Sequence, residues 1–331
     1  MEHSLPIIDI QVLLNPTGDT ATVAAQLHKA CTEVGFFYII NHDISEQVQA
    51  QLELLSAAFF QLGHDRKMQI NMAHGGKAWR GFFPVGDELT SGKPDLKEGL
   101  YFGTELPESD VRVQEQLPLH GANLFPADMP DFRKTILTYI DAMTQLGHQL
   151  MRGIALSLGL PDDYFRIHYM QDPLCLFRIF HYPPYRNISE TDYPWGVGEH
   201  TDYGMLTILK QDDKGGLQVK SKTGWIDAPY IENSFVCNIG DMLDRMTGGY
   251  YRSTPHRVRN RSGADRYSFP FFFDPDWNAS IRPISLKGVQ LPEDDQQQRW
   301  DKASVHQFEG SYGDYILQKV SKVFPDLQKK V

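Results

Sequence analysis

The segment LCLFRIFHY, residues 174–182, marks the point at which the pattern of the sequence changes. From here onward short β-type runs follow one another, separated by turn signals such as DDKGG at 212–216 and SG at 262–263. Many short strands at regular spacing are typical of a β-sandwich or barrel. We therefore predict a β-rich core with strands at 174–182, 206–210, 217–220, 235–239, 256–259 and 266–273.

Ahead of this segment the apolar residues recur mainly at helical spacing. The spacing predicts helices at 20–34, 48–60 and 132–158, with short strands at 6–10 and 36–40. A helical half packed on a β half is an α+β arrangement. Because no linker-like segment separates the halves, we expect one domain over 1–331. It would comprise a mainly helical N-terminal region with short strands at 1–170, a β core at 171–280 and a C-terminal segment at 281–331.

Composition limits the function classes that the chain can serve. The 331 residues carry 32 Lys and Arg against 42 Asp and Glu, a formal net charge of -10. Such a surface repels phosphate backbones and anionic membranes, so neither nucleic acid nor membrane is expected as a partner. From residues 1–10, MEHSLPIIDI, we do not expect a secretory signal. Three scattered cysteines, Cys31, Cys175 and Cys237, fit buried thiols in a reducing compartment. We expect a cytoplasmic protein; the sequence carries no signal for an oligomeric state.

The motif GEHTDYG at 198–204 is a candidate metal site. His200 and Asp202 are two residues apart, so on a strand both would face one side. An imidazole and a carboxylate are two of the three ligands in the facial triad of non-haem Fe(II) oxygenases. His256, in STPHRV at 253–258, opens an expected strand and is the candidate third ligand. A lone H-x-D pair is common by chance, however, and the chain has 12 histidines.

A second polar pair follows ten residues after His256. Arg266 and Ser268 would share one face of a strand. Arginine suits bidentate capture of a carboxylate, with a hydroxyl as a companion donor. An arginine aimed into a barrel interior is costly unless an anion meets it. The structural alternative is a salt bridge with an internal Asp or Glu.

At these residues the chain resembles the isopenicillin N synthase-like family of Fe(II)/2-oxoglutarate-dependent oxygenases. PIID at 6–9 and EVGFFY at 33–38 extend the resemblance over most of the chain. It implies a distorted double-stranded β-helix, or jelly roll, with flanking helices. It also implies that His200, Asp202 and His256 are the catalytic iron ligands, and that Arg266 and Ser268 hold the distal carboxylate of 2-oxoglutarate. The implied cofactors are Fe(II), 2-oxoglutarate and O2, with succinate and CO2 released.

The resemblance also suggests further ligand contacts, with one departure. Family members often carry Asn-x-Tyr-Pro, whose Asn and Tyr touch the co-substrate; FHYP at 180–183 keeps Tyr182 but has Phe180 in place of the Asn. ELTSGKPD at 88–95 is similar to bacterial ethylene-forming enzymes, in which the matching loop contacts an arginine substrate. LFRIFHYP at 176–183 and GLQVK at 216–220 resemble pyrimidine-oxidising members equally well. The candidate substrate contacts are Phe272, Glu88, Thr90, Arg178 and His181.

Three functions are open at this stage. The first is a 2-oxoglutarate-dependent oxygenase that acts on a small-molecule substrate. The second is an Fe(II) oxidase of the same fold that does not use 2-oxoglutarate, in which R-x-S would hold the carboxylate of the substrate. The third is a catalytically silent binding protein. Arg178 and His181 also have a structural alternative, as buried residues without a ligand. The sequence does not identify the substrate, nor whether the reaction is hydroxylation, desaturation, cyclisation or ethylene formation.

Overall fold

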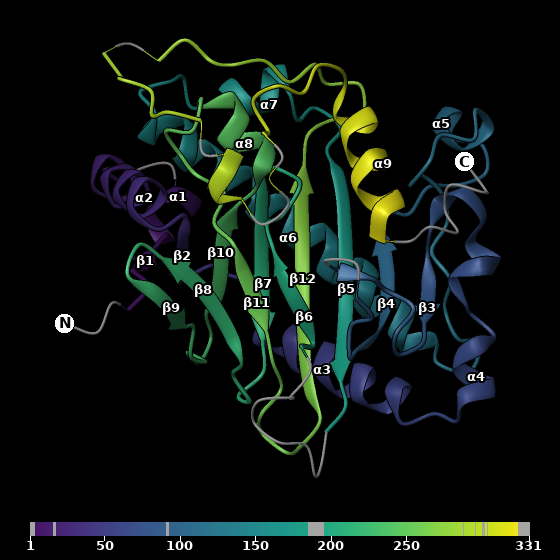
Figure 1. Cartoon of the computed structure of the whole chain (residues 1–331). Helices are drawn as coiled ribbons and strands as arrows, with labels where there is room; N and C mark the ends of the chain where they lie inside the picture. The colour runs from purple at the N-terminus through teal and green to yellow at the C-terminus, as the bar shows by residue number, and fades with distance from the viewer. Residues whose placement is uncertain are drawn as a thin grey trace.

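The computed structural model describes residues 4–15, 18–90, 93–184, 195–286, 288–294, 296–299, 302 and 304–323. Within these ranges two β-sheets form the core (Figure 1). The larger sheet has the order β1 (Ile7–Asp9), β2 (Phe36–Ile40), β10 (Phe235–Ile239), β7 (Leu206–Gln211), β12 (Arg266–Asp274), β5 (Leu174–Tyr182), β4 (Glu98–Gly103) and β3 (Gly81–Phe83). The smaller sheet has the order β6 (Val197–His200), β11 (His256–Val258), β8 (Leu217–Ser221) and β9 (Gly224–Asp227). This is the α+β jelly roll that the sequence predicts.

Alternation along β12 shows how the larger sheet is used on both faces. One face of β12 lines a pocket with the side chains of Arg266, Ser268, Pro270 and Phe272. Residues of both sheets border this pocket. The odd-numbered Phe269, Phe271 and Phe273 are fully buried. Phe273 packs against helix α6 (Pro130–Ser157), where a Cβ at Gly147 would come within 2.6 Å of its ring. One face of the sheet therefore lines the pocket, while the other packs in the hydrophobic core.

Helices cover the side of the larger sheet that faces away from the pocket. The long helix α6 contacts β5, β7 and β12, and α2 (Ala21–Glu33) and α3 (Glu46–Phe60) pack on α6 in turn. Shorter helices are α1 (Gln11–Leu14), α4 (His64–Met68), α5 (Val111–Gln114), α7 (Tyr164–His168) and α8 (Asp241–Met246), with 3-10 turns at Met72–Ala78 and Gln296–Gln298. The C-terminal helix α9 (Tyr312–Val323) lies across the upper ends of β5 and β4 in Figure 1.

Two expectations about the elements need correction. His200 and Asp202 do not share a strand, because β6 ends at His200 and Asp202 lies in the loop that follows. The first half of the chain also does more than surround the core: β1 to β4 form both edges of the larger sheet. The strand β9 was not expected from its sequence, GWID, because none of its four residues is buried.

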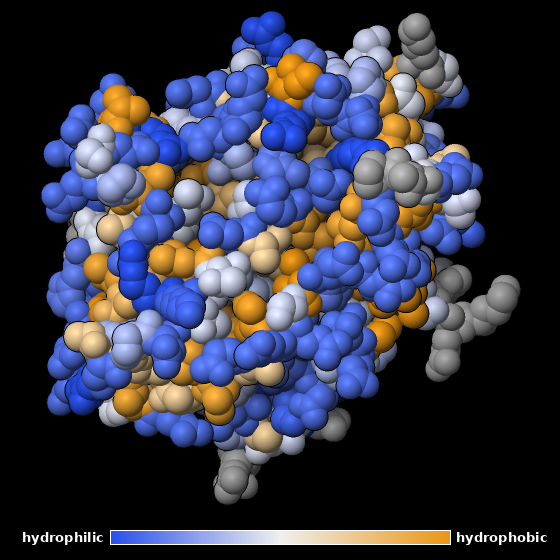
Figure 2. Space-filling model, turned by 180° about the vertical axis from the view of Figure 1, so that it is seen from behind, coloured by the Kyte–Doolittle hydropathy of each residue, from blue (hydrophilic) through white to orange (hydrophobic). Residues whose placement is uncertain are grey.

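One face of the molecule is mainly polar. Figure 2 shows the face opposite to that of Figure 1, where hydrophilic residues cover most of the surface and hydrophobic residues appear between them. Cys31, Cys175 and Cys237 are buried and free, as expected. No helix among the described residues is long and apolar enough to span a membrane.

Candidate active site

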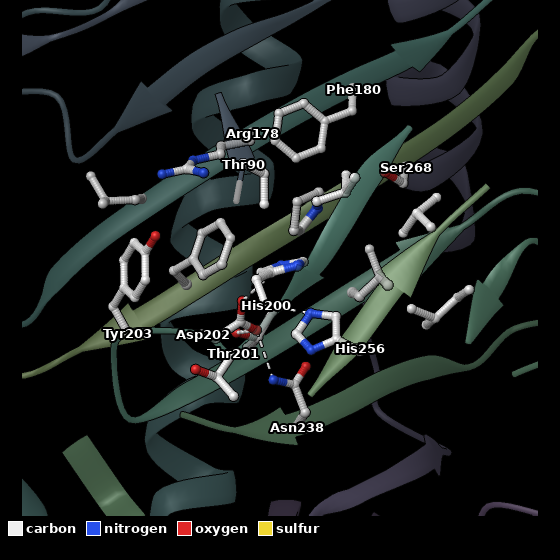
Figure 3. Close-up of a pocket in the computed structure, with 18 of the residues that line it drawn as sticks. Thr90, Arg178, Phe180, His200, Thr201, Asp202, Tyr203, Asn238, His256 and Ser268 are labelled. Atoms are coloured by element: carbon white, nitrogen blue, oxygen red, sulfur yellow. Dashed lines mark hydrogen bonds and ion pairs between the residues drawn. The ribbon is translucent and has the colours of Figure 1, made fainter. Parts of the chain in front are cut away.

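Three side chains from two strands and a loop converge at the centre of the pocket (Figure 3). His200 ends β6, His256 begins β11, and these two residues are register partners in the smaller sheet. Nε2 of His200 lies 3.8 Å from Oδ1 of Asp202, and Nε2 of His256 lies 3.7 Å from the same oxygen. The potential ligand atoms of all three residues lie within 4.8 Å of one another. One ion can therefore bind all three, which is the geometry of the facial triad.

Hydrogen bonds orient each member of this triad. Nδ1 of His200 lies 2.8 Å from the Gly198 carbonyl oxygen, and Nδ1 of His256 lies 3.3 Å from that of Thr254. Because a carbonyl oxygen only accepts, each Nδ1 carries the proton and each Nε2 offers its lone pair. The two remaining bonds hold Asp202: its Oδ2 accepts from Oγ1 of Thr207 at 2.6 Å and from Nδ2 of Asn238 at 2.7 Å.

The protonation states suit a divalent cation. Burial, together with His200 beside it, lowers the pKa of His256 to about 4. Burial lowers the pKa of His200 as well. Burial would raise the pKa of Asp202, but the two imidazoles and the bonds from Asn238 and Thr207 outweigh it, so this pKa lies below its ordinary value. Two neutral imidazoles and one carboxylate are the forms that bind metal.

Arg266 lies in the same pocket with unused hydrogen-bond donors. Its side chain is fully buried and its Nε donates to the Gly215 carbonyl oxygen. Nη1 and Nη2 have no hydrogen-bond partner among the described residues. The guanidinium carbon lies 4.6 Å from the ring centre of Tyr182, whose hydroxyl oxygen accepts from Oγ of Ser268 at 3.3 Å. No internal carboxylate pairs with Arg266 in the described structure. The expected alternative, a salt bridge between Arg266 and an internal Asp or Glu, is therefore not observed among the described residues. A dicarboxylate such as 2-oxoglutarate fits these donors.

A second group of polar residues borders the pocket beyond the triad. Arg178 projects from β5, and its guanidinium lies between the rings of Tyr101, at 4.2 Å, and Phe272, at 4.8 Å. Glu88 and Thr90 are buried and line the pocket, as does Tyr203. Of the five candidate substrate contacts, four lie at the pocket: Phe272, Glu88, Thr90 and Arg178.

His181 is the exception and is withdrawn as a candidate substrate contact. It follows Phe180 on β5, so its side chain points to the opposite face of the sheet. There its Nδ1 lies 2.8 Å from Oε1 of Glu98 and its Nε2 lies 2.8 Å from Oδ1 of Asp265. His181 is therefore a buried structural residue, whereas Arg178 remains a candidate substrate contact.

Phe180 stands where relatives carry the Asn, and its ring borders the pocket. Nζ of Lys97 lies 4.8 Å from the centre of that ring. Lys97 is 1% exposed and also lines the pocket. Sequence reasoning did not select Lys97, Thr207, Asn238 or Tyr203. The roles of Lys97, Thr207 and Asn238 depend on which strands become neighbours, whereas Tyr203 stands in the GEHTDYG motif beside Asp202.

Comparison with protein-family models gives two matches. Residues 5–128 match the model described as "non-haem dioxygenase in morphine synthesis N-terminal". Residues 161–275, which contain the triad and Arg266, match the model of the 2OG-Fe(II) oxygenase superfamily. The two matched regions together span both sheets.

Curated proteins and solved structures agree with these matches. A protein of Dictyostelium discoideum named as a probable iron/ascorbate oxidoreductase is 52% identical, over 99% of this chain and 97% of its own length. A 1-aminocyclopropane-1-carboxylate oxidase of Dictyostelium mucoroides is 42% identical, over 98% and 96%. A full-length protein of Neurospora crassa, solved in complex with alpha-KG, superposes with a TM-score of 0.78 at 29% identity, and the match covers 96% of each chain. With these relatives, the matched models and the converging triad, the chain belongs to the 2OG-Fe(II) oxygenase superfamily.

Proposed function

We propose that this Fe(II)/2-oxoglutarate-dependent oxygenase binds iron through His200, Asp202 and His256. Arg266, with Ser268 and Tyr182, would hold the distal carboxylate of 2-oxoglutarate. The observation that carries this assignment is the buried Arg266, which offers two unpaired nitrogens to the pocket that contains the triad. The small-molecule substrate would lie on the other side of the triad, against Phe272 and Tyr203.

Each residue contributes a defined task to this chemistry. Bound Fe(II) supplies the redox chemistry that couples O2 to the oxidation of both 2-oxoglutarate and the substrate. The triad ligates from one side and leaves the remaining coordination positions for ligands. Thr207 and Asn238 hold Oδ2 of Asp202, so that Oδ1 faces the two histidines. Leu209, Leu217 and Val258 line the pocket and exclude water from it.

The direct test of the triad is Asp202→Ala. Purified wild-type protein with Fe(II), O2 and 2-oxoglutarate should release succinate, and the variant should release none because a ligand is lost. Asp213→Ala is the matched control, since Asp213 is an exposed acid with 67% of its side chain accessible. Succinate release by Asp202→Ala at full iron occupancy would show that the triad is wrongly assigned.

The same assay separates the alternatives left open by the sequence. An Fe(II) oxidase that does not use 2-oxoglutarate would consume O2 with its substrate and form no succinate. A silent binding protein would bind no stoichiometric iron. The family favours the first reading, and the cytoplasmic location stays a prediction.

A further inference from the structure

Arg178 is a second arginine in the pocket with a hydrogen-bond donor that no described residue uses. Its side chain is 16% exposed and enters the pocket from β5 (Figure 3). Its Nε has no hydrogen-bond partner among the described residues. Nη1 lies 3.6 Å from Oε1 of Glu88, which is longer than a hydrogen bond. The Nε donor of Arg178 therefore has no acceptor in the described part of the chain, and a ligand in the pocket can supply one.

Glu88, the charged neighbour of Arg178, also contacts Lys97 and Tyr101. Nζ of Lys97 lies 2.8 Å from Oε2 of Glu88, and the Tyr101 hydroxyl donates to Oε1 at 2.8 Å. Burial would raise the pKa of this carboxyl, but Lys97 and Arg178 outweigh it and the pKa lies below its ordinary value. Glu88 is therefore an anion that is shared between Lys97 and Arg178, and Lys97 also pairs with Asp95.

The two arginines with unused donors serve different parts of the pocket. Arg266 is the register partner of Tyr182, which lies four residues along β5 from Arg178. Four residues of a strand correspond to roughly 13 Å. The hydroxyl of Tyr203 points toward Arg178 on the side of the triad away from Ser268 (Figure 3). One anionic group can satisfy Arg266 without reaching Arg178.

We propose that Arg178 binds a carboxylate of the primary substrate, so that the enzyme acts on small carboxylic acids. This inference rests on the proposed function, in which 2-oxoglutarate occupies Arg266. The rings of Tyr101 and Phe272 hold the guanidinium plane in place and shield its ion pair with the substrate from water. A substrate that carries a cation and no carboxylate is repelled by the charge of Arg178, so we expect it to bind more weakly.

The test uses two probe sets matched in shape. One set is phenylacetate, phenylacetamide and 2-phenylethylammonium; the other is cyclopropanecarboxylate, its amide and cyclopropylmethylammonium. Calorimetry is performed without oxygen on protein loaded with Fe(II) and 2-oxoglutarate. In at least one set the carboxylate should bind about tenfold more tightly than the amide and the ammonium compound, corresponding to about 1.4 kcal/mol.

Variants show whether Arg178 causes this preference. Arg178→Gln should weaken binding of the carboxylate by about tenfold or more, since a charge-assisted bond is lost. Binding of the amide should change little. Arg178→Lys should keep part of the preference. Glu88→Gln should strengthen carboxylate binding, because it removes the negative charge beside Arg178, and an unfolded or distorted pocket would not give this gain. The control is Arg133→Gln, at an arginine on α6 with 48% of its side chain exposed.

The outcomes separate this inference from the proposed function. If the visible band of the iron–2-oxoglutarate chelate does not form in the wild type, the proposed function itself fails. If the band forms but no carboxylate binds more tightly than its amide in either set, the role of Arg178 is refuted. An equal loss of carboxylate and amide binding in Arg178→Gln would also refute it.

Discussion

At the scale of single residues, the environment of Asp202 matters as much as its identity. Oδ2 accepts two short hydrogen bonds from Thr207 and Asn238, so Oδ1 is the oxygen turned toward the histidines. Contacts of this kind orient a ligand and typically account for a 10- to 100-fold difference in metal affinity.

Removal of one of these contacts should therefore weaken iron binding while the three ligands stay in place. We expect Thr207→Val to reduce Fe(II) affinity by about 10- to 100-fold, measured by anaerobic titration. Thr223→Val is the control, because Thr223 is exposed and its hydroxyl lies 3.1 Å from Oγ of Ser221 in the turn between β8 and β9. Equal affinity in wild type and Thr207→Val would show that the bond to Thr207 does not orient the ligand.

The sequence identifies the residues with strong motifs and misses those that support them. His200, Asp202 and Arg266 stand in short patterns with recognisable chemistry, so they could be selected before the fold was known. Lys97 and Asn238 reach the pocket only because β4 joins β5 and β10 joins β7. His181 shows the opposite error: it is adjacent to pocket residues in sequence, yet strand alternation sends it to the other face.

At the scale of elements, helix α9 completes the wall of the pocket. Ile316 and Val320 line the pocket, while two tyrosines anchor the helix beneath them. The Tyr312 hydroxyl donates to Oδ2 of Asp274 at 2.5 Å, and the Tyr315 hydroxyl donates to Oδ2 of Asp241 at 2.8 Å. Both carboxylates are buried, so each tyrosine satisfies a group that would be costly to leave unpaired.

Loss of one anchor should loosen the helix. Tyr315→Phe should lower the free energy of unfolding by about 1–3 kcal/mol, because the buried Asp241 loses a donor. It should also speed amide hydrogen exchange in α9 more than in β5. Denaturant titration and exchange mass spectrometry measure the two effects, with Tyr230→Phe as the control at an exposed tyrosine. Unchanged exchange in α9 would contradict the anchoring role.

Elements were predictable where the hydrophobic pattern is strong. The buried strands β2, β5 and β10 lie at the expected residues, because apolar residues dominate each of these runs. The short strand β6 could not be delimited, since three of its four residues are only partly buried. This is why Asp202 was expected on a strand and is found in a loop.

At the scale of the whole molecule, the order of the strands joins the two halves of the chain. β2 pairs with β10, and β4 pairs with β5, so strands from the first half complete both edges of the larger sheet. The expectation of one domain over 1–331 stays a prediction, and this interleaving supports it. Sequence alone could not show it, because long-range strand pairing leaves no local pattern.

We therefore expect the protein to unfold as one cooperative unit. Scanning calorimetry of the iron-free protein should give one transition, with a calorimetric enthalpy equal to the van't Hoff enthalpy. Two separable transitions would show that the N-terminal region and the β core are independent folding units.

The central claim is that Arg266 holds 2-oxoglutarate on iron bound by the triad. The most direct test is anaerobic addition of Fe(II) and then 2-oxoglutarate to purified protein, while the weak visible charge-transfer band of the chelate is followed. The account predicts that the band appears in the wild type, and that Arg266→Gln needs at least about 100-fold more 2-oxoglutarate to reach it, since a buried charge-assisted pair is lost. A band that forms equally well in Arg266→Gln, or iron binding with no band in the wild type, would contradict it.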